Sequence, residues 1–466
     1  MNKPHSLQDW QNLAQKSLRD KALSSLVHAS AGGLNFDPLY HQRPDVQAVL
    51  HAAPLTRWDN RLSVLGSTTQ EQNNHALKGL CGGISSLQFT LQSQSRASAS
   101  SPADFSNLLN DVQLDIAPIS LFAAESFSDA AAALTAHWQE QGLSLNNMIG
   151  SFNADPIGTL AAQGHLDTGL DNLLTELGTL ANNTIQRTPK AMPVCVNTCV
   201  YHNAGATMAQ ELASAIATAV IYMQTMAQHG IADSSAASMI VFQFAADADH
   251  IANVTKFRAL KQLWHHVQTQ LAVPVQPLNL VVETSKRMLS KREPWVNHLR
   301  NVSAVAAAAM GGAQSIVVHP HNRVDEQLLD DDSAIANRVA RNLPIIMADE
   351  AALTFVHDPM AGAYSIEQLT TQLTASTWAL LQELESSGGL VINLENGDWQ
   401  TAIRTAHAAR ITQLQEQHAV CVGVNRFNEA AVQHGSVSHI NPPNNERPGT
   451  EPLHSVREAS AFELDS

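Results

Sequence analysis

Charge is scarce in this sequence of 466 residues. Charged residues make up 15% of it, against roughly 25% in typical soluble domains, so much of the surface is expected to be buried or covered by a partner. Lys and Arg number 27 and Asp and Glu number 42, which gives a net charge of −15. A protein that binds a phosphate backbone needs a basic face, so this balance argues against nucleic acid and against an anionic membrane surface.

Cysteine and long apolar runs are also scarce. The sequence holds four cysteines, too few for a disulfide framework in a chain of this size: Cys81, Cys195, Cys199 and Cys421. The opening MNKPHSLQDW lacks the apolar core of a signal peptide. The longest near-apolar run, residues 304–313, is far shorter than the ~18 residues that span a bilayer. We therefore expect a cytoplasmic protein with reduced thiols and no membrane span.

The main pattern present is an alternation of short apolar runs with helical patterns. Long helical patterns, such as residues 204–228 and 251–271, separate the later runs. The runs end in small or polar residues and cover residues 84–91, 112–120, 147–152, 192–198, 238–246, 278–285 and 314–320. The alternation predicts parallel strands with right-handed crossovers. Seven or eight such units favour an α/β fold of the closed (β/α)8 TIM barrel type, whose active groups lie at the C-terminal ends of the strands.

The two ends of the sequence differ from this pattern. Residues 7–27 place apolar residues at helical spacing, and residues 30–65 are too long and irregular for an ordinary connection. The segment around NPPNNERPGTEP has almost nothing to bury. The predicted organisation is an N-terminal helical arm that contacts another subunit (1–65), the barrel (66–390), a connecting helical region (391–428) and a flexible linker or tail (429–466).

One polar cluster is a candidate for substrate binding. His202 and Asn203 follow a predicted strand and directly precede AGAT at residues 204–207. Because the N–H groups at a helix N-terminus can bind an anion or a substrate carbonyl, these two residues are the candidate substrate-binding pair. The alternative, favoured by the frequency of Asn at helix starts, is that Asn203 simply caps the next helix.

Other reactive residue types give weaker patterns. His319 and His321 are possible metal ligands, but no carboxylate or Cys follows at a suitable spacing and Pro320 indicates a turn. Cys195 and Cys199 are expected to be small core residues. We find no G-x-G-x-x-G, P-loop, G-x-S-x-G or H-E-x-x-H pattern. The residues by themselves predict a barrel with no metal site and no catalytic set.

Six ordered blocks of the sequence resemble a known family. They cover residues 10–40, 204–223, 256–264, 293–315, 338–342 and 357–370, including AGATMAQELASAIATAVIYM and HDPMAGAYSIEQLT. In this order and spacing the chain resembles the methylmalonyl-CoA mutase family, and within it the small subunit of the two-chain enzymes.

The resemblance implies a barrel that takes an acyl-CoA along its axis. It also implies adenosylcobalamin, held by a separate C-terminal flavodoxin-like domain, as the source of the radical for a carbon-skeleton rearrangement. The D-x-H-x-x-G pattern of that domain fits none of the 21 His residues here. We therefore expect the cobalamin-binding domain to be missing, adenosylcobalamin to be bound by a partner chain, and no cofactor to be bound by this chain alone.

The sequence departs from the catalytic chains of the family at their functional residues. Those chains carry GYHxxEAGAT where this one has TCVYHNAGAT, so that Cys199 and Val200 replace the catalytic Tyr-His pair. An aliphatic Val cannot donate a hydrogen bond to a thioester carbonyl. The region that supplies a substrate-facing Tyr and Arg is absent, and Asn279 replaces an Arg that contacts the coenzyme A phosphate. Gln314 does match a cofactor-facing Gln and is the candidate cofactor-binding residue.

The resemblance therefore implies the small subunit of an adenosylcobalamin-dependent methylmalonyl-CoA mutase, an isomerase. We expect a heterodimer with a catalytic large subunit, in which this chain has no catalytic residues of its own. Two alternatives stay open. One is the barrel half of a split acyl-CoA mutase whose cobalamin domain is a separate chain, and the other is a non-catalytic protein that binds acyl-CoA.

Overall fold

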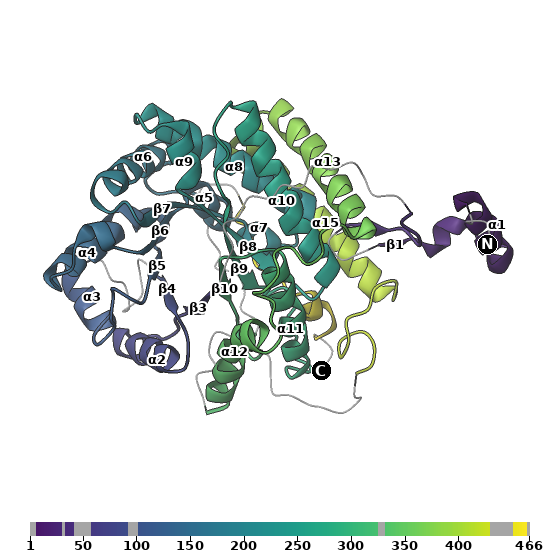
Figure 1. Cartoon of the computed structure of the whole chain (residues 1–466), viewed down its shortest axis with the longest axis horizontal. Coiled ribbons are helices and arrows are strands. Elements are labelled where there is room, and N and C mark those ends of the chain that lie inside the picture. Colours follow the sequence, from purple (N-terminus) through teal and green to yellow (C-terminus); the bar gives the residue numbers. More distant parts are fainter. Residues whose placement is uncertain are drawn as a thin grey trace.

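The computed structural model describes residues 6–29, 33–41, 57–91, 101–324, 331–428 and 451–463. Parallel strands close into a barrel in the order β10-β3-β4-β5-β6-β7-β8-β9, and helices surround it (Figure 1). The strands are β3 (Asp59–Ser63), β4 (Ser86–Thr90), β5 (Ile119–Phe122), β6 (Gly150–Ala154), β7 (Ala191–Asn197), β8 (Ile240–Ala246), β9 (Asn279–Thr284) and β10 (Ser315–Val317). The predicted (β/α)8 TIM barrel is confirmed.

The helices form one layer around the barrel and a partial second layer outside it. The inner layer holds α2 (Thr69–Cys81), α3 (Pro102–Leu108), α4 (Phe127–Glu140), α5 (Pro156–Gln163), α6 (Leu170–Arg187), α7 (Cys199–Asn203), α8 (Met208–Gln228), α9 (Asp233–Ser238), α10 (His250–Gln270), α11 (Val296–Met310) and α12 (Asp331–Asp349). Helix α13 (Tyr364–Ser386) packs outside α8 and α10, and α14 (Gly389–Glu395) and α15 (Asp398–Gln415) follow. None of the helices in the described ranges is long and apolar enough to cross a membrane.

The barrel begins earlier than the sequence predicted. Strand β3 lies within residues 1–65, the range assigned to the arm. Its sequence, DNRLS, is too polar to suggest a buried strand. The structure accommodates Asp59 because its carboxylate accepts hydrogen bonds from Ser86 and Ser315 and pairs with Arg61. These contacts tie β3 to both neighbouring strands.

The N-terminal segment extends away from the barrel. Helix α1 (Leu7–Leu18) lies at one end of the long axis of the molecule, and none of its residues is buried (Figure 1). It is followed by a 3₁₀ turn (Leu23–Leu26) and an antiparallel pair formed by β1 (His28–Ala29) and β2 (Asn35–Phe36). Leu34 is buried, so the segment is anchored at this point while α1 remains exposed.

The C-terminal segment differs from the predicted flexible tail in the part that the structure describes, residues 451–463. Leu453 and Ala459 are buried, and the backbone N–H groups of Leu453 and Val456 donate to the carbonyls of Ala161 and Asn203. A short 3₁₀ helix (Glu458–Phe462) ends the segment. The prediction failed because it weighed the polar stretch before Leu453 and not the few apolar residues after it. Residues 429–450 of the predicted tail lie outside the described residues.

Gly150 allows β5 and β6 to pair closely. Its φ is +135°, and a Cβ there would collide with the backbone oxygen of Ile119. We expect Gly150→Ala to lower the free energy of unfolding by about 3 kcal/mol or more, because backbone atoms cannot move aside as a flexible side chain does. Gly142 is the matched control, since its φ is also positive (+73°) but nothing lies near its Cβ position. Gly142→Ala is expected to cost about 1 kcal/mol, and equal losses in urea unfolding of the two variants would contradict this account.

Candidate ligand site at the barrel mouth

A cavity of about 940 Å³ opens at the C-terminal ends of the barrel strands. Amide side chains from four strands line it: Gln88, Asn153, Asn197 and Gln243. The C-terminal segment contributes Leu453 and Ser455 to the same wall. The cavity is therefore in the place where (β/α)8 barrels hold their ligands, and its size is within the usual range for small-molecule sites.

Two layers of inward-facing side chains explain why this end of the barrel is polar. Small apolar side chains form a buried cluster: Cys195, Val241, Val281 and Val317. Side chains alternate along a strand, so the residues two positions further on face the same way. Those residues are Asn197, Gln243, Glu283 and His319, all of which line the cavity. Apolar side chains therefore fill the inside of the barrel, and hydrogen-bonding side chains line the end at which the cavity opens.

Charged groups occupy one side of the cavity. The Glu283 carboxylate lies 3.5 Å from His319 Nε2 and 3.4 Å from Gln243 Nε2. Arg323 donates to His319 Nδ1 at 3.0 Å. Lys286 also lines the cavity. Three further acidic residues, Glu125, Asp155 and Asp167, also line the cavity. Lys286 and Arg323 are therefore available to an anionic group of a ligand only on the side of the cavity where Glu283 lies.

The protonation states follow from burial and from these contacts. Burial lowers the pKa of His319 to about 4, so its ring is neutral at pH 7. Burial by itself would raise the pKa of Glu283, but His319 and Lys286 more than offset this and hold that pKa below its usual range. The Glu283 carboxyl is therefore ionised, and the net charge of the group comes from Glu283, Lys286 and Arg323.

Two buried carbonyl oxygens at the cavity have no hydrogen-bond partner among the described residues. They are Oε1 of Gln88 and Oδ1 of Asn203, on side chains that are 5% and 9% exposed. A buried polar atom without a partner costs about 1–3 kcal/mol. A ligand that donates hydrogen bonds would recover this energy, so both atoms indicate a binding site.

Strand β6 is irregular where it reaches the cavity. Its register with β7 shifts between Ser151 and Ala154, and Asn153 has a φ of +45°, which is unusual for a residue other than glycine. The Asn153 side chain donates to Ser120 Oγ and to the Leu121 carbonyl. Bulges and strained backbone of this kind concentrate at functional sites, because only a surrounding structure that fixes them makes them stable.

His202, one of the two predicted substrate-binding residues, does not line the cavity. Its Nδ1 contacts the Glu211 carboxylate, its Nε2 lies 2.7 Å from Ser285 Oγ, and all three residues are only 1% exposed. The order Ser285–His202–Glu211 has the form of a hydrolytic triad, but its complete burial leaves no access for a substrate. His202 is a structural residue, and burial, followed by the charge of Arg287, lowers its pKa, so that the ring stays neutral.

Asn203, the other predicted residue, does line the cavity. It does not cap the next helix, because the N-cap of α8 is Thr207. The Thr207 side chain accepts from the backbone of Gln210, and the Gln210 side chain accepts from the backbone of Thr207. The alternative that Asn203 is only a helix cap was therefore wrong.

Gln314, the predicted cofactor-binding residue, lies at the opposite end of the barrel. It directly precedes β10, and its side chain accepts from the backbone of Leu280 and donates to the carbonyl of Leu278. Both ends of the amide therefore already hold β9 in place. This position is remote from the mouth, and Gln314 is not available to a cofactor there.

The segment that replaces the catalytic pair is at the cavity wall. Cys199 and Val200 both line the cavity, whereas Tyr201 is buried in the core. No tyrosine is among the described residues that line the cavity. The His321 ring stacks on Trp295, and the described ranges contain no group of three or more His, Cys, Asp and Glu that suits a metal ion. The mouth has groups for binding, and the Cys199 thiol lies in hydrogen-bond contact with the Glu283 carboxylate.

The fold and this mouth define the chain as a (β/α)8 barrel protein with a ligand-sized cavity at the strand ends. Comparison of sequences then gives the particular family. Residues 94–463 match the family model described as methylmalonyl-CoA mutase, so the chain belongs to the methylmalonyl-CoA mutase family.

Curated relatives support the small-subunit type within the family. The methylmalonyl-CoA mutase small subunit of Streptomyces virginiae is 32% identical over 88% of this chain and 66% of its own length. That of Propionibacterium freudenreichii subsp. shermanii is 28% identical over 84% of this chain and 60% of its own. The methylmalonyl-CoA mutase of Cereibacter sphaeroides is 26% identical over 91% and 64%. The chain spans less than two thirds of each of these relatives, and the predicted small-subunit-like type is confirmed.

Glu211 and Lys256 form a buried ion pair behind the mouth, with Nζ and Oε2 2.8 Å apart. We expect Glu211→Gln to cost about 3–5 kcal/mol, because it leaves the ammonium buried without a counter-charge. The double variant Glu211→Gln with Lys256→Met should recover at least half of that loss. The exposed pair of Arg57 and Asp349 is the control, and Asp349→Asn should cost less than about 1 kcal/mol.

Urea unfolding of the four proteins measures these differences. A loss in Glu211→Gln no larger than in Asp349→Asn, or a double variant less stable than Glu211→Gln, would contradict the assignment of the pair as a structural element.

Proposed function

We propose that this chain is a non-catalytic subunit of an adenosylcobalamin-dependent methylmalonyl-CoA mutase and that it forms a heterodimer with a catalytic large subunit in the cytoplasm. The observation that carries the proposal is the presence of Cys199 and Val200 on the cavity wall. The resemblance to catalytic chains assigns a Tyr and a His to these two positions. The small-subunit names of relatives from Streptomyces virginiae and Propionibacterium freudenreichii also support it.

Neither Val200 nor Cys199 can supply the chemistry of the catalytic residue that it replaces. Val200 offers no hydrogen bond to a developing charge on a thioester oxygen. Burial, together with the charge of Glu283, raises the pKa of the Cys199 thiol well above its usual value, so the thiol stays protonated. A buried thiol of this kind is a poor nucleophile. The wall beside the cavity is therefore inert toward an acyl group.

The proposal places no cobalamin site on this chain, and one observation supports this. Gln314 was the residue matched to the cofactor, and its amide is fully used at the far end of the barrel. When bound, adenosylcobalamin supplies the radical for the rearrangement, and the proposal assigns its binding to the large subunit. We derive no step through the cofactor on this chain.

Partner binding is assigned to the N-terminal arm. Helix α1 has no buried residue, although Leu7, Trp10 and Leu13 recur at every third position and form an apolar stripe. Covering an apolar helix face with a second surface removes it from water, which lowers the free energy. The low charge fraction of the whole chain also favours a large permanent interface.

The isolated chain is expected to show no conversion of methylmalonyl-CoA to succinyl-CoA in the presence of adenosylcobalamin. The complex with a large mutase subunit should be active, and Lys286→Ala in this chain should change its kcat by less than about twofold, because this mouth takes no part in turnover. The assay is product formation followed by chromatography. Turnover by the isolated chain, or loss of kcat in the complex with Lys286→Ala, would contradict the proposal.

Ligand binding without chemistry is the second candidate function. The unpartnered oxygens of Gln88 and Asn203 and the cations Lys286 and Arg323 all face a cavity of about 940 Å³. A scaffold needs none of these features. An acyl-CoA, with its anionic groups and amide N–H donors, has the chemistry that these residues would bind.

Calorimetry with methylmalonyl-CoA tests this second function. Lys286→Ala and Gln88→Leu are each expected to weaken binding about tenfold, equivalent to about 1.4 kcal/mol, because each removes one contact to the ligand. Lys190, exposed at the opposite end of the barrel just before β7, is the matched control, and Lys190→Ala should leave the affinity unchanged. If the unaltered chain gives no heat of binding at millimolar ligand, the cavity is not an acyl-CoA site.

A further inference from the structure

The barrel mouth contains a third buried polar atom without a hydrogen bond. Nε2 of His319, a residue that is 1% exposed, has no hydrogen-bond partner among the described residues. It adds to Oε1 of Gln88 and Oδ1 of Asn203, and all three residues line the same cavity. Because native proteins leave few buried polar atoms unpaired, three of them around one cavity indicate groups with which a ligand pairs.

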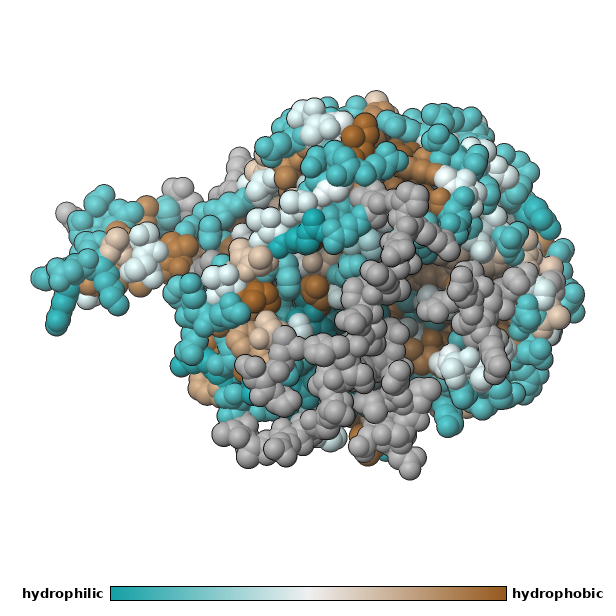
Figure 2. Space-filling view, turned by 180° about the vertical axis from the view of Figure 1, so that it is seen from behind, coloured by the Kyte–Doolittle hydropathy of each residue, from teal (hydrophilic) through white to brown (hydrophobic). Residues whose placement is uncertain are grey.

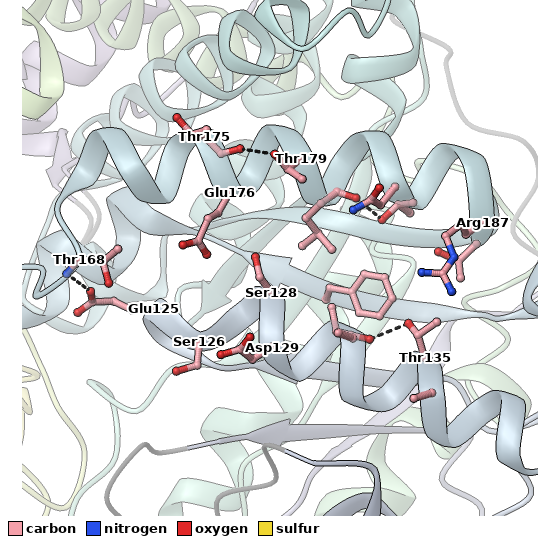
Figure 3. A pocket seen from close by; sticks show the side chains of 18 of the residues that line it. Glu125, Ser126, Ser128, Asp129, Thr135, Thr168, Thr175, Glu176, Thr179 and Arg187 are labelled. Carbon is pink, nitrogen blue, oxygen red and sulfur yellow. Dashed lines mark hydrogen bonds between the residues drawn. The ribbon is translucent and has the colours of Figure 1, made fainter.

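Other parts of the surface offer less to a specific ligand. The coloured part of the face in Figure 2 is mostly hydrophilic, and its apolar residues lie in separate patches. A cavity of about 760 Å³ lies outside the barrel between α4 and α6 (Figure 3). Hydroxyl groups on its walls, such as those of Thr135 and Thr179, donate to carbonyls of their own helices. None of the described residues that line this outer cavity has an unpartnered buried polar atom.

The contact with Arg323 determines which ring nitrogen of His319 carries the proton. Arg323 Nη1 lies 3.0 Å from His319 Nδ1. A guanidinium group only donates hydrogen bonds, so Nδ1 of the ring is the acceptor. The proton of the neutral imidazole is therefore on Nε2, and the unpartnered atom is an N–H donor.

Several contacts hold this donor in place. Arg323 Nη1 also donates to Ser63 Oγ on β3 at 3.2 Å. The backbone N–H of His319 donates to Thr284 Oγ1 at 2.9 Å, and its carbonyl accepts from Asn301 Nδ2 at 2.8 Å. Both the backbone and the ring of His319 are thus fixed by the protein, and the donor is preorganised.

Glu283 does not use this donor. Its carboxylate lies 3.5 Å from His319 Nε2 without forming a hydrogen bond. The carboxylate has other partners, the Gln243 amide at 3.4 Å and the Cys199 thiol. Since Cys199 and His319 contact the same carboxylate, the Nε2–H group lies close to Val200, where the resemblance to catalytic chains assigns a His.

We propose, building on ligand binding at the mouth as the second candidate function, that His319 donates a hydrogen bond from Nε2 to a carbonyl oxygen of the ligand, and that Arg323 is the positioning residue that fixes this donor. Gln88 and Asn203 supply the complementary acceptors. An amide has both a carbonyl oxygen for His319 and an N–H for one of these acceptors, so the ligand is a compound with an amide group. The donor that is absent at Val200 is then supplied by the residue two positions after β10.

Nitrogen-15 NMR of the full chain with labelled histidine tests the donor. His319→Gln identifies the signals of this ring by their loss. At pH 7 the unaltered chain should carry the proton on Nε2, and millimolar pantetheine, which has amide groups and no phosphate, should shift the Nε2 signal. A proton on Nδ1, or an Nε2 signal that pantetheine leaves unchanged, overturns the proposal.

The same spectra test the role of Arg323. Arg323→Met should give a mixture of the two tautomers, because Nδ1 then lacks its donor. Arg323→Lys should keep the proton on Nε2, since an ammonium group also donates. Arg187→Met, in the outer cavity, is the control and should leave the His319 signals unchanged. A proton that stays on Nε2 alone in Arg323→Met contradicts the positioning role.

Calorimetry with methylmalonyl-CoA separates this proposal from the function on which it builds. His319→Leu removes the donor and should weaken binding about tenfold, whereas His319→Gln retains an N–H group and should lose less than about threefold. Equal affinity of His319→Leu and the unaltered chain overturns the proposal and leaves acyl-CoA binding intact. If methylmalonyl-CoA does not bind but pantetheine shifts the Nε2 signal, acyl-CoA binding fails and the role of His319 stands. The NMR test uses the unaltered chain, so it decides the question even if His319→Leu does not fold.

Discussion

The contact between Glu211, Lys256 and His202 holds the barrel mouth in its shape. One carboxylate on α8 binds the ammonium of α10 and the imidazole of α7, and all three side chains are buried. Breaking such a contact leaves a charge in the protein interior, so the three helices cannot shift independently. Helix α7 carries Val200 and Asn203, and the buried contact thereby fixes both at the cavity wall.

The function that we propose for this mouth is binding and support, and the proposal assigns catalysis to another chain. A neutral His319, an ionised Glu283 and two cations offer contacts to a ligand, whereas the positions nearest α7 offer an aliphatic group and a protonated thiol. In this proposal the barrel keeps the fold of the methylmalonyl-CoA mutase family without the groups that react. Such a chain contributes to a complex if its outer surface stabilises the partner.

The fold was predictable from the sequence because apolar runs and helical patterns alternate along the chain. Strand β3 was missed, since the polar sequence DNRLS joins the barrel only through partners on β4 and β10. Asn203, chosen for its position after a strand, lines the cavity, and its role in substrate binding stays a prediction. His202 and Gln314 were assigned to a ligand, although distant residues occupy their side chains. Lys286 and Arg323 were missed, and their positions just after strands β9 and β10 were the available signal.

The central proposal is that this chain binds no cobalamin and that its partner does. The most direct measurement is the number of adenosylcobalamin molecules bound per complex of this chain with a large mutase subunit, determined by spectrophotometric titration. The account predicts one cobalamin per heterodimer and none bound by this chain alone. Two cobalamins per heterodimer, or saturable binding to the isolated chain, would contradict it.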